Sequence, residues 1–272
     1  MSGGWTTVAR KEFRDAGRSR SLWALTAVMV LSVAVAVYVI GFLLSTAPEN
    51  EMTGMALVGG IAQQGRFFIT SLVSVLGLMV AYASIVGERS SGSLKILLGL
   101  PYSRRDVVLG KLVGRTAVFV VATLIAFAVG FLVLLTYGVT APVDYLFLVV
   151  LTTVLGVAYV SVGTALSASI RTRSHAATAA VGVFFFFKFL WDTSLVPRVV
   201  VYVARRDMSA LTSPPGWYDY LVALGPNVAY SNVAGGYVEG FGNVETFSAL
   251  VLVFWVVVPV VFGWRVFEKS DL

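Results

Sequence analysis

The sequence contains no cysteine and a single histidine, His175. The lack of cysteine excludes disulfides, thiolate metal sites and a cysteine nucleophile, and one histidine excludes metal sites built from several histidines. The motifs HExxH and GxSxG are absent, as are paired aspartates in apolar segments. Nothing therefore supports a membrane protease, and we expect neither a metal site nor a catalytic residue in this chain.

Charged residues are scarce as well, at 12% of 272 residues, whereas soluble domains carry about 25%. Hydrophobic residues make up 58% of the chain, and the mean hydropathy is +0.87. A water-soluble core cannot hide so much apolar surface, so the composition predicts an all-α integral membrane protein rather than a globular enzyme. The net charge of +6 then favours loops facing anionic headgroups over a nucleic-acid partner.

Six apolar runs are long enough to span a bilayer, which takes roughly 20 residues. We expect one transmembrane domain over residues 1–272. The predicted spans are approximately 22–44, 67–86, 112–135, 143–170, 176–196 and 248–266. The first run is too long for the apolar region of a signal peptide and lacks a cleavage site, which favours an uncleaved span. The sixth contains Pro259, which predicts a kink. No internal repeat supports an inverted-repeat carrier.

The distribution of Lys and Arg predicts the orientation. The N-terminal segment, the loop 87–111, the loop 171–175 and the C-terminal tail carry fourteen of these residues. The connections on the opposite side carry four, namely Arg66, Arg198, Arg205 and Arg206. This imbalance places both termini in the cytoplasm of a multi-pass protein of the cell membrane.

The N-terminal segment reads as a short amphipathic helix, with apolar side chains near one face and charges on the rest. We expect it to lie on the inner membrane surface, although it would also serve as a simple topology anchor. The residues assigned to this interfacial helix are Trp5, Arg10, Lys11, Phe13 and Arg14, with Val8 or Ala9 completing the apolar face.

The external connection 197–247 is apolar but interrupted by Gly and Pro, and its pieces are too short to span a bilayer. An aromatic turn at residues 214–218 suits the headgroup layer. We expect short re-entrant or interfacial helices before the last span. The alternative is a loop that lies loosely on the bilayer.

The loop 87–111 predicts a small cytoplasmic helix. Ser93 can cap a helix that runs through Leu98, and Pro101 would end it. Leu94, Leu97 and Leu98 would then form one apolar patch, which something must cover. An interfacial helix with positive-inside charge would explain the same residues.

The pattern Glu-x-x-x-Gly-Ser-Leu-x-x-Leu-Leu-x-x-Pro-x-x-Arg, followed by Gly110-Lys111-Leu112, resembles the signature of type-2 ABC-transporter permeases. The resemblance implies the permease of an exporter, whose loop couples to a separate cytoplasmic ATPase subunit that binds ATP and Mg. It also implies pairing with a second permease subunit, as a homodimer or heterodimer. The residues assigned to the ATPase-coupling interface are Glu88, Arg89, Gly92, Ser93, Leu94, Leu97, Leu98, Pro101, Arg104, Arg105 and Lys111.

The chain itself has no nucleotide-binding motif. Gly87 and Gly92 have Walker spacing, but Ser93-Leu94 follows where Lys-Ser/Thr is required. No cofactor and no enzymatic activity are therefore expected in this chain. The alternatives are an ATP-independent channel or secondary carrier, and a membrane anchor or assembly protein.

Lys188 and Asp192 form a candidate intramembrane polar pair at i, i+4 in the fifth span. Intramembrane charges are costly and often functional, which favours a polar point in a substrate path. The alternative is an ion pair that extends to the outer headgroups. No residue of the sequence identifies the substrate.

Overall fold

The structure is a computed structural model that describes residues 4–45, 58, 60, 66–99, 102–138 and 141–269. Over these residues it is a bundle of helices without strands. Six helical stretches are long and apolar enough to cross a membrane, which confirms the predicted number of spans. They contain α2 (Arg20–Ser45), α4 (Arg66–Ala81) with α5 (Val86–Ser91), α7 (Arg104–Leu135), α8 (Pro142–Ser169), α9 (Arg173–Phe185) with the π-helix η3 (Phe186–Trp191), and α13 (Asn243–Glu268).

Local sequence explains where several helices begin. The Ser103 side chain accepts from the backbone N–H of Asp106, whose carboxylate accepts from the N–H of Ser103, a capping box that starts α7. Pro142 occupies the first turn of α8, where its missing N–H costs nothing. Thr172 caps α9 through its side chain.

Four spans differ from their predicted bounds by five residues or more; the second ends at Ser91 rather than 86, and the sixth begins at Asn243 rather than 248. The third was expected to begin at residue 112, but α7 begins at Arg104, so much of the predicted loop 87–111 is helical. At 1.5 Å per residue its 32 residues extend about 48 Å, more than the roughly 30 Å of a hydrocarbon core. The fifth span ends at Trp191 rather than 196, because Ser194 adopts a left-handed conformation and a separate helix follows. Pro259 lies within α13, which continues through it as one helix.

The long helix α8 is the centre of the bundle. It packs against α4, α7 and α13, and more of it is buried than of any other span. Small residues permit these contacts, since a Cβ at Gly156 would overlap the ring of Phe119. In contrast, α2 and α9 lie at the periphery with many exposed apolar side chains, as expected for helices that face lipid.

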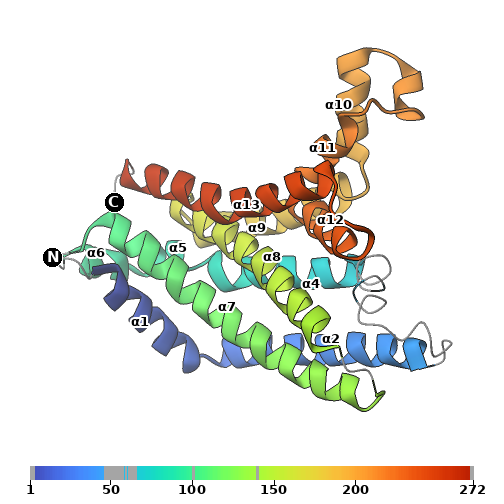
Figure 1. Cartoon of the computed structure of the whole chain (residues 1–272). Helices are drawn as coiled ribbons and strands as arrows, with labels where there is room; N and C mark the ends of the chain where they lie inside the picture. The colour runs from blue at the N-terminus through green and yellow to red at the C-terminus, as the bar shows by residue number, and fades with distance from the viewer. Residues whose placement is uncertain are drawn as a thin grey trace.

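Both termini lie at one end of the bundle, together with α1 (Gly4–Gly17) and α6 (Ser93–Leu98) (Figure 1). The segment before the last span lies toward the other end. It forms α10 (Leu195–Arg205), the 3₁₀ helix η4 (Met208–Leu211), α11 (Tyr218–Ala223) and α12 (Pro226–Glu239). Short helices were predicted there. The alternative of a loose loop is wrong for α12, which packs against α8 and α13 and fully buries Tyr230.

Candidate functional site

The turn between α5 and α6 is the most exposed part of the predicted coupling segment. Gly92 ends α5 with φ of +78°, a conformation that L side chains rarely adopt, and this allows α6 to begin at the next residue. Ser93 is therefore the first residue of α6 rather than its cap, and its hydroxyl lies 2.9 Å from Ser91 Oγ. Residues 90–93 are all exposed.

Leu94 and Leu97 belong to the apolar patch that was expected to be covered, and this chain itself covers them. Their side chains are 1% and 9% exposed and pack within this chain against Ile85, Val107 and Phe267, among others. These two leucines therefore fix α6 to the bundle rather than presenting an open apolar surface. The side chain of Leu98 and all of Pro101 lie outside the described residues.

An ion network holds α1, α5 and α7 together behind this turn. Lys111, only 1% exposed, pairs with Glu12 and with Glu88, whose Oε1 lies 2.9 Å from its Nζ. Glu12 Oε2 also lies 2.8 Å from Arg115 Nη2, and Lys11 Nζ lies 3.6 Å from Glu88 Oε1. Glu88 and Lys111, predicted to contact the ATPase, therefore fix the internal geometry of the segment.

Burial alone would raise the pKa of Glu12, but the positive charges of Lys111, Arg115 and Lys11 outweigh it and hold the pKa below its ordinary value. Glu12 therefore stays ionised at neutral pH. A buried lysine between two carboxylates is stable for the same reason, since each charge compensates the others.

Two glycines bring α1 this close to α7. A Cβ at Gly110 would lie 2.5 Å from the Cβ of Val8, and one at Gly114 would lie 2.6 Å from the Cβ of Glu12. The two helices thus run side by side in parallel, as Figure 1 also shows. The buried face of α1 consists of Val8, Ala9, Glu12 and Ala16.

This face includes a glutamate, which the predicted amphipathic pattern had placed among the outward charges. The other residues assigned to the N-terminal helix are exposed: Trp5, Arg10, Lys11, Phe13 and Arg14.

Two arginines connect the segment to the ends of other spans. Arg89 Nη1 donates to the carbonyl of Ile170, which follows α8, at 3.2 Å. Arg104 Nη1 donates to the carbonyls of Phe267 and Glu268 at the end of α13, at 2.9 and 3.0 Å. Both guanidinium groups also lie over the Phe267 ring. A cation near a helix C-terminus is favourable, so these contacts tie α5 and α7 to α8 and α13.

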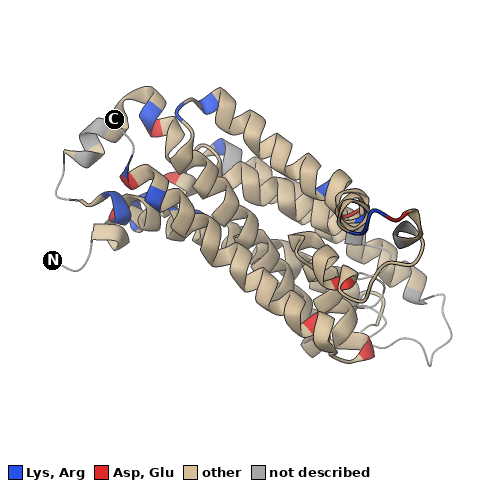
Figure 2. Ribbon diagram, turned by 90° about the horizontal axis from the view of Figure 1, so that it is seen from above, with Lys and Arg blue, Asp and Glu red and all other residues tan. Residues whose placement is uncertain are grey.

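Arg105 remains exposed, with its guanidinium over the ring of Trp264. Lys and Arg residues, blue in Figure 2, gather at this end of the bundle, whereas most of the ribbon along the spans is uncharged. Gly92, Ser93 and Arg105 are the exposed members of the predicted interface among the described residues, while Glu88, Arg89 and Arg104 are half-buried.

The predicted polar pair is an exception in the spans, with Lys188 within η3 and Asp192 directly after it. Lys188 Nζ lies 3.3 Å from Asp192 Oδ2 and donates to Thr70 Oγ1 at 2.7 Å. It also lies 4.2 Å from the centre of the Phe67 ring, and the residue is 3% exposed. Lys188 therefore faces the protein interior against α4 and does not extend outward.

Asn227, at the start of α12, connects this pair to two more spans. Its Nδ2 donates to Asp192 Oδ2 at 3.0 Å, and its Oδ1 accepts from Ser74 Oγ at 3.1 Å and Tyr159 OH at 2.9 Å. Sequence reasoning missed Asn227, Ser74, Tyr159 and Thr70. A signal for Asn227 is its position directly after Gly225-Pro226 in an otherwise apolar segment.

A cavity of about 270 Å³ adjoins this network, lined by Phe67, Thr70, Lys188, Asp192, Thr193, Asn227, Val228 and Ser231. Its charges and amide can orient a polar group. Among the described residues, no three His, Asp or Glu side chains gather to hold a metal ion.

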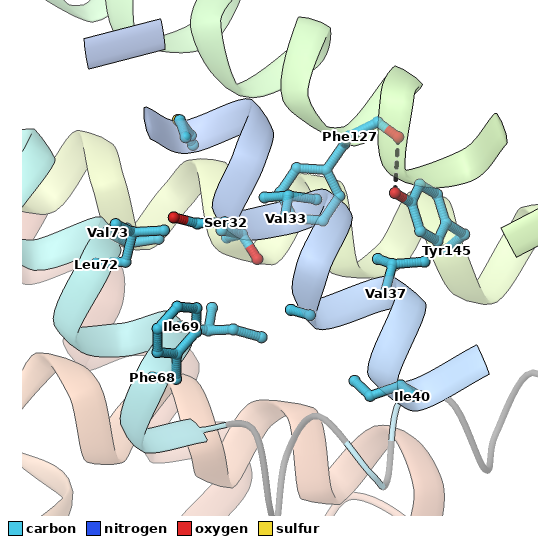
Figure 3. Close-up of a pocket in the computed structure, with 13 residues that line it drawn as sticks. Ser32, Val33, Val37, Ile40, Phe68, Ile69, Leu72, Val73, Phe127 and Tyr145 are labelled. Atoms are coloured by element: carbon cyan, nitrogen blue, oxygen red, sulfur yellow. Dashed lines mark hydrogen bonds between the residues drawn. The ribbon is translucent and has the colours of Figure 1, made fainter. Parts of the chain in front are cut away.

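A second pocket lies between α2, α4, α7 and α8, and its lining is apolar apart from three hydroxyl side chains (Figure 3). It holds only about 30 Å³, roughly the share of one water in the liquid. Tyr145 OH in its wall donates to the Phe127 carbonyl at 2.7 Å. With so little space and its phenol engaged, this pocket is packing between spans rather than a substrate site.

Comparison with known proteins matches residues 6–272 to the family described as ABC-2 family transporter protein. The chain is 27% identical to a probable ABC transporter permease protein NosY of Stutzerimonas stutzeri, over 87% of this chain and 83% of the relative. It is 30% identical to the protein of the same description from Pseudomonas aeruginosa, over 72% of this chain and 70% of the relative.

Proposed function

This chain belongs to the ABC-2 transporter family as a membrane-spanning permease subunit of the cell membrane, and from that premise we propose that it is part of an exporter. Its energy would come from ATP and Mg²⁺ bound to separate ATPase subunits. Two permease subunits would form the pathway between them, as a homodimer or a heterodimer.

The observation that carries this proposal is the exposed turn at residues 90–93, backed by a buried scaffold. A docking surface transmits force only if it is fixed to the elements that must move. Here the leucines of α6, the ion network of Lys111 and the contacts of Arg89 and Arg104 fix the turn to α1, α7, α8 and α13.

We propose that the ATPase contacts residues 90–93 and Arg105, and that its motion reaches the ends of α8 and α13 through the two arginines. When the ATPase subunits approach each other, the turn would move as one body with the ends of these spans. Rigid-body movement of this kind switches a transport pathway between two access states. The polar cavity at Asn227 would then be a point that the substrate passes.

The test is purification of the tagged permease after co-expression with the ABC ATPases of its own genome. We expect one ATPase to co-purify and to hydrolyse ATP in the reconstituted complex. Ser91→Trp should reduce both by an order of magnitude, and Ser213→Trp, an exposed serine outside the predicted interface, should change neither.

If the chain were an ATP-independent carrier or a membrane anchor, no ATPase would co-purify whose rate of ATP hydrolysis depends on the permease. Equal co-purification and hydrolysis with Ser91→Trp and Ser213→Trp would contradict the proposed docking turn while leaving the family assignment intact.

A further inference from the structure

The helix α10 stands apart from the bundle. In Figure 1 it projects across the direction of the spans, and in Figure 2 it is seen nearly end-on, so the two views agree that it runs roughly perpendicular to them. Among the described elements its main contacts are with η3, η4 and α11, and its buried side chains are Pro197 and Val201. A helix perpendicular to the spans at one end of the bundle lies parallel to the membrane surface.

The outer face of α10 carries an apolar stripe. Leu195, Val199 and Val203 are spaced i, i+4, i+8 and therefore share one face. They are 53%, 54% and 65% exposed, so nothing in the described chain covers them. Tyr202, next to the stripe, is also exposed. A stripe of large apolar side chains on a projecting helix needs a cover of matching chemistry.

Basic side chains border this stripe. Arg198 and Arg205, seven residues apart, lie along one edge of it, and Arg206 ends the helix in a left-handed conformation. All three are exposed, and Asp207 is the only acidic residue in the stretch 195–209. An apolar face bordered by arginines is typical of helices that lie in the headgroup layer of anionic membranes.

We propose that α10 is an in-plane membrane anchor that inserts Leu195, Val199 and Val203 into the outer leaflet and binds lipid phosphates through Arg198 and Arg205. The perpendicular direction, the uncovered stripe and the basic edge each fit a lipid surface. Such an anchor holds η3 in place, because Leu195 follows the end of η3 after only three residues. The Lys188–Asp192 pair would then keep its depth in the membrane while the spans move.

The native chain lacks cysteine, so single spin labels need no background removal. We would label Val199→Cys on the stripe and Ala204→Cys, also exposed but more than a third of a helical turn away. The full permease with its ATPase is placed in phosphatidylcholine vesicles, with or without phosphatidylglycerol. Collision rates with oxygen, which concentrates in the bilayer, are compared with those of a water-soluble nickel chelate.

We expect the ratio of oxygen to nickel collisions to be several-fold higher at residue 199 than at residue 204. Phosphatidylglycerol should raise the ratio at residue 199 further, and Arg198→Gln with Arg205→Gln should remove that increment. Equal, water-like ratios at both positions would overturn the anchor.

Shielding of residue 199 from both reagents would assign the stripe to a protein partner and overturn the proposal equally. If the ratio of oxygen to nickel collisions at residue 199 does not change with phosphatidylglycerol, the proposed role of the arginines is wrong.

Discussion

At the scale of single residues, Lys188 is a charged side chain buried within a span, so its stability depends on its partners. Its charge is stabilised by Asp192 and by the Thr70 hydroxyl. Removing one partner of a buried pair leaves an uncompensated charge and can cost roughly 3–5 kcal/mol, whereas replacing both is far milder. Polar contacts measured within membranes average only about 0.6 kcal/mol, which is the lower of the two reference values.

We therefore expect Lys188→Met and Asp192→Asn each to lower the Tm of the detergent-solubilised protein more than the double variant does. The coupling energy should be about 1 kcal/mol or more, between these two reference values. Thermal unfolding followed by tryptophan fluorescence measures it. Small and additive effects would mean that the two charges do not depend on each other.

Glu12 makes the packing of α1 depend on pH. Because its pKa in the folded protein is lowered, the stabilisation is fully present above the ordinary glutamate pKa of about 4.3 and is lost as the pH falls through the lowered value. We expect spin labels at Thr7→Cys and Val113→Cys to stay close at neutral pH and to separate in acid.

With Glu12→Gln in the same background, the separation between the labels should already be larger at neutral pH, and acid should change it little. If the distance between the labels at residues 7 and 113 stays constant in the chain that retains Glu12, down to the lowest pH at which the protein remains folded, this role of Glu12 is wrong.

The sequence identifies these residues unequally. Lys188 and Asp192 are visible because charges in an apolar run are rare and their i, i+4 spacing is local. The bonds of Asn227 to Ser74 and Tyr159 join residues 153 and 68 positions apart. No local pattern contains such pairs. Lys111 was found, but its buried carboxylate partner Glu12 was missed for the same reason.

At the scale of elements, the contact between α1 and α7 depends on Gly110. A Cβ there would overlap Val8 Cβ and the Trp5 carbonyl. Overpacking of this kind typically costs 1–3 kcal/mol, so we expect Gly110→Val to cost about that much and to lower the Tm by several degrees. It should also expose α1 to limited proteolysis.

Gly182→Val in α9 is the matched control, because a Cβ there meets nothing within 4 Å. Unchanged stability and proteolysis with Gly110→Val would show that α1 does not depend on close contact with α7.

The helix α6 shows how far an element can be predicted. A helix ending at Leu98 was predicted there and the structure confirms it, although Ser93 is its first residue rather than its cap. The spacing of Leu94 and Leu97 also implies a covered face. It does not say which molecule covers it, because Val107 and Phe267 come from distant parts of the sequence. We therefore expect Leu97→Asp to destabilise this end of the bundle rather than to remove an ATPase contact alone.

At the scale of the whole molecule, the number of spans could be predicted because hydropathy over about 20 residues reports bilayer thickness directly. The early start of α7 could not, because Arg104, Arg105 and Lys111 read as a loop. In the structure Arg104 donates to a carbonyl at the end of α13, and Lys111 pairs with Glu12 and Glu88. These partners allow a charged helix to continue beyond the bilayer.

The orientation of the molecule is a further prediction. The excess of Lys and Arg at the end that bears the termini predicts Ser103 inside and Asn243 outside. In intact cells, a membrane-impermeant maleimide should label Asn243→Cys and spare Ser103→Cys, since both positions are exposed on the protein. Labelling of both, or the reverse pattern, would refute the proposed topology.

The central claim is that the turn at residues 90–93 is where this permease meets its ATPase. Inside-out vesicles present this turn to the medium, and Ser91→Cys is the only cysteine in the variant chain. The direct measurement is its rate of labelling by an impermeant maleimide with and without the co-purifying ATPase. We predict rapid labelling without the ATPase and at least tenfold slower labelling with it, while Arg18→Cys, exposed at the N-terminal end, stays reactive in both. Equal labelling of Ser91→Cys in a complex that holds its ATPase would contradict the account.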